Sequence, residues 1–214
     1  MSLAIPPIRS IVFDLDGTLY SAQPIADQIQ RAAETLIAAT RGLSLVDGRA
    51  LLRRARRALT DSGDEEPTLT RTCQELGIEI AALHRAFQEQ VRPEDCLVPD
   101  PVLRALLESL SAHCRLYIYT NNSYPLAQRI LALLDVSEYF ERLYTIEYCG
   151  QPKPDLDAFR KVVEDIGGLP ESFLFVGDRE PVDLRPAADA GMATLLVRET
   201  ADLLQIHRLL GIIP

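Results

Sequence analysis

The chain has 214 residues, of which 47% are apolar and 25% charged, a composition that allows one good core with a smaller companion domain. Its 22 Lys and Arg against 31 Asp and Glu give a net charge of −9, which disfavours a protein that binds nucleic acid or anionic membranes in general. No apolar run is long enough to cross a bilayer, and the first residues do not read as a secretion signal.

The first predicted strand, residues 10–14, ends in a pair of carboxylates. Asp14 and Asp16 are two residues apart, so in extended chain they face the same way. Buried carboxylates are costly unless a cation or hydrogen bonds compensate them, so this stretch predicts a partner. Gly17 and Thr18 then turn the chain, and the glycine lets a ligand approach the backbone closely.

Residues 21–96 contain no convincing strand. Apolar spacing predicts helices over residues 24–40, 47–59, 67–76 and 79–91. We interpret this region as a helical insertion that forms a small domain and closes over a site. Its segment 50–59 interleaves four arginines with leucine and alanine. We expect an amphipathic helix with a solvated basic face, the alternative being an arginine that reaches the substrate.

Strands and helices alternate after the insertion. Strands are predicted over residues 115–120, 143–146, 173–177 and 193–197. Helices are predicted to begin after the caps Asp100, Ser123 and Asp155, and a last one over residues 201–210. This order predicts an α/β fold in which a parallel sheet is covered by helices on both faces.

The predicted strand ends carry a set of reactive side chains. Ligands of open parallel sheets bind beyond the carboxyl ends of the strands. The second strand ends in Thr120-Asn121, just before a helix N-terminus, a combination that suits an anion. Lys153 follows the third strand between two prolines, and Asp178 and Asp183 follow the fourth. Each alone has a bland interpretation as a turn, cap or solvated residue, but together they predict one site.

These motifs, FDLDGTL, YTN, a KP lysine and VGD with Asp183 five residues on, resemble the haloacid dehalogenase superfamily of phosphohydrolases. The resemblance covers nearly the whole chain. It implies a Rossmann-like parallel core of residues 1–20 and 97–214 flanked by helices, and an inserted α-helical cap of residues 21–96 between the first and second motifs. It is specific for the superfamily and leaves the substrate open.

The resemblance also implies catalytic roles. Asp14 attacks phosphorus and forms an aspartyl-phosphate. Asp16 protonates the leaving oxygen and then activates the water that hydrolyses the intermediate. Thr120 and the backbone N–H of Asn121 bind the phosphoryl oxygens, and Lys153 balances charge on the phosphate and on Asp14.

Mg²⁺ is the cofactor that the resemblance implies. Asp14, the backbone carbonyl of Asp16 and Asp178 are the expected ligands, and Asp183 is expected to act through water or by orienting Lys153. The dehalogenase branch lacks an acid at the place of Asp16, which favours phosphoryl transfer here. Relatives often carry a small polar residue at the place of Arg179, which we interpret as an exposed helix-start residue, the alternative being a partner of Asp183.

The sequence therefore predicts a Mg²⁺-dependent phosphatase acting on a small phosphorylated metabolite, with nucleotidase-like and phosphoglycolate- or sugar phosphatase-like specificities open. One alternative is a phosphomutase that uses the same intermediate. Another is a non-catalytic phosphate- or metal-binding protein, although a phospho-accepting signalling module needs neither the large insertion nor Asp16. The four cysteines are widely spaced and form no CxxC, which indicates buried thiols in a reducing compartment and a cytoplasmic location.

Overall fold

The computed structural model describes residues 8–63 and 67–212. Two compact units make up the chain. One combines the described residues up to Ser21 with those from Leu97 onward, and the other is Ala22–Cys96. The first unit holds a five-stranded parallel sheet in the order β3-β2-β1-β4-β5, which confirms the predicted α/β fold.

The strands are β1 (Ser10–Phe13), β2 (Arg115–Tyr119), β3 (Phe140–Tyr144), β4 (Phe173–Gly177) and β5 (Ala193–Leu196). The helices of this unit are α5 (Pro101–Ser111), α6 (Tyr124–Leu133), α7 (Ile146–Cys149), α8 (Leu156–Ile166), α9 (Arg185–Asp189) and α10 (Gln205–Leu209).

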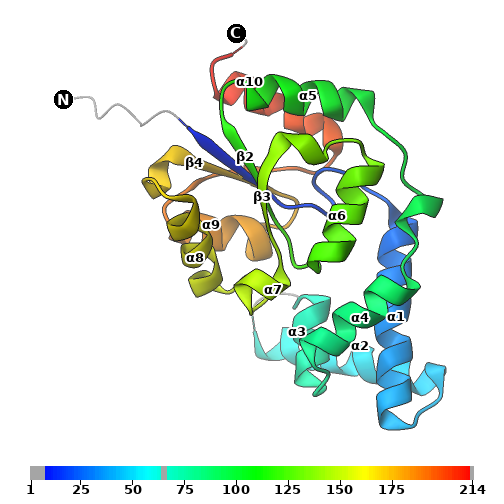
Figure 1. Ribbon diagram of the computed structural model, residues 1–214. Coiled ribbons are helices and arrows are strands. Elements are labelled where there is room, and N and C mark those ends of the chain that lie inside the picture. The colour runs from blue at the N-terminus through cyan, green and yellow to red at the C-terminus, as the bar shows by residue number, and fades with distance from the viewer. Residues whose placement is uncertain (1–7, 64–66, 213–214) are drawn as a thin grey trace. The chain divides into compact units, whose positions relative to one another are not determined.

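The central strand β1 is buried along its whole length. Its Val12 pairs in register with Tyr117 of β2 and Phe175 of β4. Side chains on this face pack against Phe159 of α8, whose ring lies 4.9 Å from that of Tyr119. Figure 1 shows α8 and α9 on one side of the sheet and α5 and α6 on the other, so that both faces are covered. This double cover explains the continuous apolar runs of the inner strands.

Two predicted elements differ from the observed ones. The third strand is Phe140–Tyr144 rather than 143–146, because it lies at the sheet edge and carries the exposed charges of Glu141 and Arg142. Ile146 instead begins the short helix α7. The predicted helix 201–210 is divided into the 3₁₀ turn η5 (Thr200–Leu204) and α10.

The helix caps were predicted with mixed success. Asp100 accepts hydrogen bonds from the backbone N–H of Val102 and Leu103, and Asp155 caps α8 in the same way, as predicted. Ser123 also occupies the N-cap position of α6, as predicted, but its side chain makes no cap hydrogen bond to this helix.

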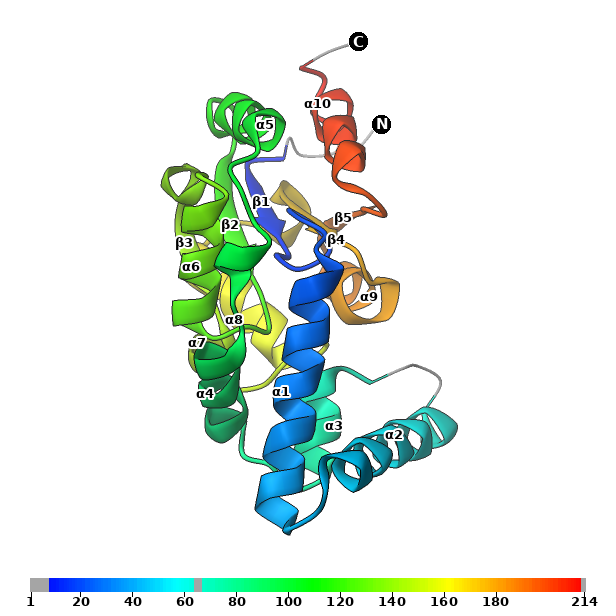
Figure 2. The same ribbon diagram turned by 90° about the vertical axis from the view of Figure 1, so that its right-hand side faces the viewer.

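The second unit contains α1 (Gln23–Arg41), α2 (Leu45–Ser62), α3 (Leu69–Glu75) and α4 (Ile80–Gln90). Within it, α1 packs against both α2 and α4 (Figure 2). Arg53, Arg54 and Arg57 of α2 are exposed, which agrees with a solvated basic face. Among the described residues, every helix is too short or too polar to traverse a lipid bilayer.

Candidate functional site

Three carboxylates from separate segments converge beyond the ends of β1 and β4. Asp14 follows β1, Asp178 follows β4, and Asp183 lies in the π-helical turn η4, Glu180–Leu184. One oxygen from each lies within 4.8 Å of the others. Since β1 and β4 are parallel neighbours, their carboxyl ends meet at one edge of the sheet. The structure thus brings together three acids that the sequence assigned to one site, and we call them the acid cluster.

Lys153 reaches the acid cluster from the loop before α8. Its Nζ donates to Asp14 Oδ1 and to Asp183 Oδ1, at 2.6 Å each, and to the backbone oxygen of Tyr119 at 3.0 Å. The side chain is only 2% exposed, and Nζ faces the rings of Tyr119 and Phe175. A lysine buried this deeply stays charged only with compensating partners, and the two carboxylates are those partners.

Burial dominates the ionisation of these groups. It raises the pKa of Asp14, against the attraction of Lys153. It raises the pKa of Asp178 to about 6, and repulsion from Asp183 adds to the effect. Burial lowers the pKa of Lys153, but the two bound carboxylates raise it by more, so the net pKa lies above the ordinary value and the lysine remains a cation. One ammonium group cannot balance three carboxylates, and the acid cluster favours an additional positive charge.

The acid cluster fits a divalent cation. Asp178 Oδ1 is buried and has no hydrogen-bond partner among residues 8–63 and 67–212. Buried polar atoms are otherwise almost always bonded, so this oxygen calls for a ligand. Carboxylate oxygens are the donors that hard cations such as Mg²⁺ prefer, and Asp14 and Asp178 supply them from two neighbouring strands.

Gly17 makes the close approach of Asp178 possible. Its φ of +86° is a backbone conformation that other residues rarely adopt. A Cβ at this position would overlap Asp178 Oδ2 and lie 2.7 Å from Asp178 Cγ. The glycine in the first motif therefore has a second role beside turning the chain: it leaves space for a carboxylate from β4.

Replacing Gly17 with alanine is expected to destabilise the protein more than the same change at Gly150. Both glycines have positive φ, and apart from the chain neighbours of Gly150 no described residue lies within 4 Å of a Cβ built at that position. The left-handed conformation costs about 1–2 kcal/mol at either position, while the overlap with Asp178 adds about 1–3 kcal/mol at Gly17 alone. Urea denaturation measures both. Equal losses in the two variants would contradict the packing role.

Asp16 lies outside the acid cluster. Its Oδ1 accepts a hydrogen bond from the Tyr20 hydroxyl, and its Oδ2 accepts one of 2.6 Å from Asn122 Nδ2. Burial raises the pKa of Asp16, while the hydrogen bond from Tyr20, the positive charge of Lys153 and the Thr120 hydroxyl favour the ionised form. The side chain is thus held apart from the three acids. The metal contact that the resemblance implies for its backbone carbonyl stays a prediction.

Thr120 and Asn121 are fixed at the end of β2. The buried Thr120 hydroxyl accepts the N–H of Asn122 at 3.1 Å. The Asn121 side chain forms two hydrogen bonds with the backbone of Lys153, accepting its N–H at 2.7 Å and donating to its oxygen at 3.3 Å. The amide therefore ties the loop after β2 to the loop that carries the lysine. Their roles in phosphate binding stay predictions.

Arg179 contributes to the site through its backbone. Its N–H donates to Asp183 Oδ2 at 3.2 Å, which helps to orient that carboxylate. Its positive charge is also a minor influence that lowers the pKa of Asp178, after burial and Asp183, which raise it. Arg179 is partly buried, so it is not the fully exposed helix-start residue that we expected, and its backbone contacts Asp183.

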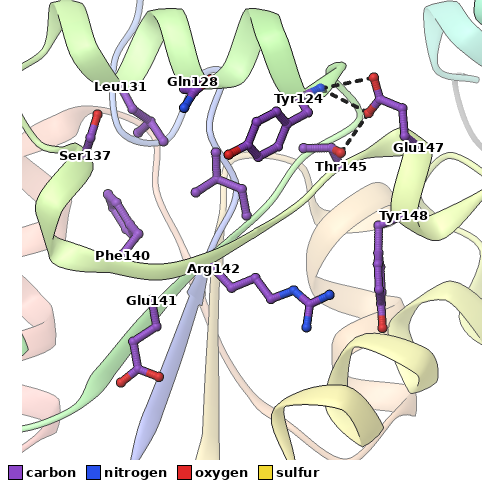
Figure 3. A pocket seen from close by; sticks show the side chains of 11 residues that line it. Tyr124, Gln128, Leu131, Ser137, Phe140, Glu141, Arg142, Thr145, Glu147 and Tyr148 are labelled. Carbon is purple, nitrogen blue, oxygen red and sulfur yellow. Dashed lines mark hydrogen bonds between the residues drawn. The ribbon is translucent and has the colours of Figure 1, made fainter.

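A pocket of about 670 Å³ lies against the edge strand β3 and α6 (Figure 3), and none of the predicted site residues lines it. Glu147 of α7 forms one wall, and its carboxylate accepts the Tyr124 N–H and the Thr145 hydroxyl. Glu147 thereby caps α6 in place of Ser123. Because α6 begins where the 120–123 loop ends, this carboxylate supports the loop that carries Thr120 and Asn121.

Sequence reasoning missed Tyr20, Asn122 and Glu147 as individual contributors to the site. Tyr20 approaches Asp16 through a tight turn in which Gly17 N–H donates to the Tyr20 oxygen. A spacing of four residues in an irregular turn carries no periodic signal. Asn122 bonds to Asp16 across a separation of 106 residues, so no local spacing indicates the contact.

Comparison with known proteins gives a consistent result. Residues 8–191 match the family of haloacid dehalogenase-like hydrolases. The chain is 27% identical over 199 residues to a phosphoglycolate phosphatase of Salmonella typhimurium, which covers 86% of this chain and 79% of that protein. It is 24% identical over 202 residues to a glyceraldehyde 3-phosphate phosphatase of Methanopyrus kandleri, with coverages of 89% and 84%. The crystal structure of an HAD phosphatase from Thermococcus onnurineus superposes with a TM-score of 0.63 at 19% identity, over 95% of this chain and 98% of that one.

Proposed function

The chain belongs to the haloacid dehalogenase-like hydrolases, and from this premise we propose that it is a Mg²⁺-dependent phosphatase of small phosphate monoesters. The observation that carries the proposal is the buried Lys153 bound between Asp14 and Asp183, beside the unpartnered oxygen of Asp178. Such a site offers a carboxylate nucleophile together with positive charge, and both are needed when an anion attacks an anion.

Asp14 is the proposed nucleophile. Lys153 binds its Oδ1, and the Thr18 hydroxyl donates to its Oδ2 at 3.3 Å, so the carboxylate is fixed in orientation. Attack of a carboxylate oxygen on phosphorus forms the aspartyl-phosphate and breaks the bond to the leaving oxygen. The Lys153 ammonium group lowers the repulsion between the carboxylate and the phosphate dianion.

Asp16 is the proposed general acid and base. It sits two residues from the nucleophile, and its carboxyl group is engaged by neutral donors rather than by the lysine. It gives its proton to the leaving oxygen in the first half of the reaction, and takes one from water in the second half. Thr120 and the Asn121 N–H are proposed to bind the phosphoryl oxygens.

Asp14, Asp178 and the backbone carbonyl of Asp16 are the proposed Mg²⁺ ligands, with Asp183 held in place by Lys153 and Arg179 N–H. The cation supplies electrostatic stabilisation of the phosphoryl oxygens. Its fit rests on the chemistry of the acid cluster and on the unpartnered Asp178 oxygen.

A small phosphorylated metabolite is the proposed substrate. The relatives named for phosphoglycolate and glyceraldehyde 3-phosphate hydrolysis support this class. The net charge of −9 argues against a polyanionic partner such as nucleic acid. The four cysteines are free, which supports a reducing compartment such as the cytoplasm. That residues 21–96 form a cap that selects the leaving group stays a prediction.

Removing divalent cations is expected to stop the reaction. After treatment with EDTA, phosphate release from p-nitrophenyl phosphate, phosphoglycolate and a panel of nucleoside and sugar phosphates should fall to background, and Mg²⁺ should restore it. Asp178→Asn should weaken Mg²⁺ binding at least about 10-fold in calorimetry, because it removes a charged ligand. Asp157→Asn, at an exposed carboxylate, is the matched control. Turnover in EDTA, or no turnover of any ester with Mg²⁺, would refute the proposed function.

A further inference from the structure

Two buried side chains hold the carboxyl group of Asp16 between them. Tyr20 and Asn122 are 7% and 6% exposed, and each donates one hydrogen bond to a different oxygen of Asp16. Tyr20 lies in the turn after β1, and Asn122 lies in the loop after β2, so the two donors come from segments that are far apart in the sequence. The carboxyl plane is therefore fixed at both oxygens.

The two donors are themselves held by the backbone. The backbone oxygen of Tyr20 accepts the N–H of Gly17 at 2.9 Å. The backbone oxygen of Asn122 accepts the N–H of Ile146 at 3.1 Å, and the backbone N–H of Asn122 donates to the Thr120 hydroxyl. These contacts fix the backbone positions from which the two donor side chains extend. Such support is what keeps a proton-transferring group within a fraction of an ångström of its working position.

We infer that Tyr20 and Asn122 are positioning residues that aim the Asp16 carboxyl group at the leaving-group oxygen. The inference rests on the proposed function. This role accounts for the location of Asp16 outside the acid cluster, because the two hydrogen bonds hold its carboxyl group away from Lys153 and from the three acids. The acid cluster then serves phosphorus and the cation, and Asp16 serves the departing alcohol.

The two donors determine where the proton sits. A carboxylate oxygen has two acceptor positions, and Tyr20 and Asn122 occupy one on each oxygen of Asp16. The transferable proton is left with the remaining acceptor positions of the carboxyl group. When Asp14 attacks and the phosphorus–oxygen bond breaks, the bonding pair stays on the leaving oxygen. That oxygen takes the proton from Asp16, which becomes a carboxylate.

The test compares two esters that differ in how much they need a proton. Phenyl phosphate releases a phenolate about as basic as tyrosinate, with a pKa of about 10. p-Nitrophenyl phosphate releases a much weaker base that departs without help. The values of kcat/KM report the step that transfers the phosphoryl group to Asp14. We expect Tyr20→Phe to lower kcat/KM about 10-fold for phenyl phosphate and less than about 3-fold for p-nitrophenyl phosphate. The 10-fold loss is smaller than the full contribution of a general acid, because Asp16 itself remains in place.

Asn122→Ala is the second variant, since it removes the side-chain donor and keeps both backbone hydrogen bonds. It should show the same discrimination between the esters. Tyr117→Phe is the control, because its hydroxyl donates to Glu141 of the edge strand instead. It should leave the ratio of the two kcat/KM values unchanged. Circular dichroism melting curves establish that each variant is folded.

Each outcome is decisive. An altered ratio in Tyr20→Phe or in a folded Asn122→Ala supports the inference. Equal losses for both esters in both variants indicate a structural role alone and overturn it, as does wild-type behaviour. If the folded wild-type protein hydrolyses neither these two esters nor any other ester of the panel with Mg²⁺, the proposed function itself fails, and that result is distinct from a wild-type enzyme whose variants keep the ratio.

Discussion

Replacing Asp14 with asparagine is expected to abolish phosphate release and leave the protein folded. The side chains have the same shape, but an amide cannot attack phosphorus as a carboxylate does. We expect a loss of at least about 10³-fold in kcat, the scale found when a nucleophile is removed. Lys153 keeps its hydrogen bonds to Asp183 and to the Tyr119 oxygen, so its charge remains compensated.

Phosphate release from p-nitrophenyl phosphate at saturating Mg²⁺ is the measurement. Asp165→Asn serves as the control, since it removes a carboxylate of the same unit whose partners are Arg142 and Tyr144 on β3. This control should keep near wild-type turnover. If Asp14→Asn did the same, the nucleophile would be another group and the proposed reaction would be wrong.

Replacing Lys153 with methionine is expected to lower both stability and activity. Asp14 and Asp183 would then be buried without the ammonium group that now binds them at 2.6 Å. Removing one partner of a buried ion pair costs about 3–5 kcal/mol of unfolding free energy, since the remaining charge is uncompensated. Activity should fall as well, because the attack of Asp14 on a dianion loses its nearest positive charge.

Urea denaturation without added metal measures the stability loss. The control is Lys161→Met, at an exposed lysine whose Nζ donates to the Tyr148 oxygen, and it should change stability by about 0.5 kcal/mol or less. Adding Asp183→Asn to Lys153→Met should restore part of the loss, because one of the two stranded carboxylates is removed. Equal stability of the Lys153 and Lys161 variants would contradict a structural role for the buried ammonium group.

The inner strands could be predicted from the sequence because both of their faces are buried. Residues 173–177 match β4, and the prediction for β1 differs only by including Asp14. The edge strand could not be placed in the same way, since Glu141 and Arg142 face solvent and interrupt the apolar run. Apolar periodicity reports burial, and it weakens wherever a strand has an open side.

The candidate site could be predicted only as a set of strand ends. Parallel topology is enough to bring Asp14 and Asp178 to one edge, and the structure adds that Lys153 binds Asp14 and Asp183 together. The contacts of Asp16 could not be predicted. They depend on the path of the turn to Tyr20 and on the rotamer of Asn122, which a single sequence does not encode in any spacing.

The position of β1 has a consequence for synthesis on the ribosome. This strand emerges first, yet its neighbours in the sheet contain Arg115 and Phe173, which pair with Ser10. Residues 22–96 are contiguous and can form their own core while the nascent chain is still growing. The apolar strand that precedes Asp14 therefore lacks its two partners, and is open to chaperones and to aggregation, until β2 and then β4 have been translated.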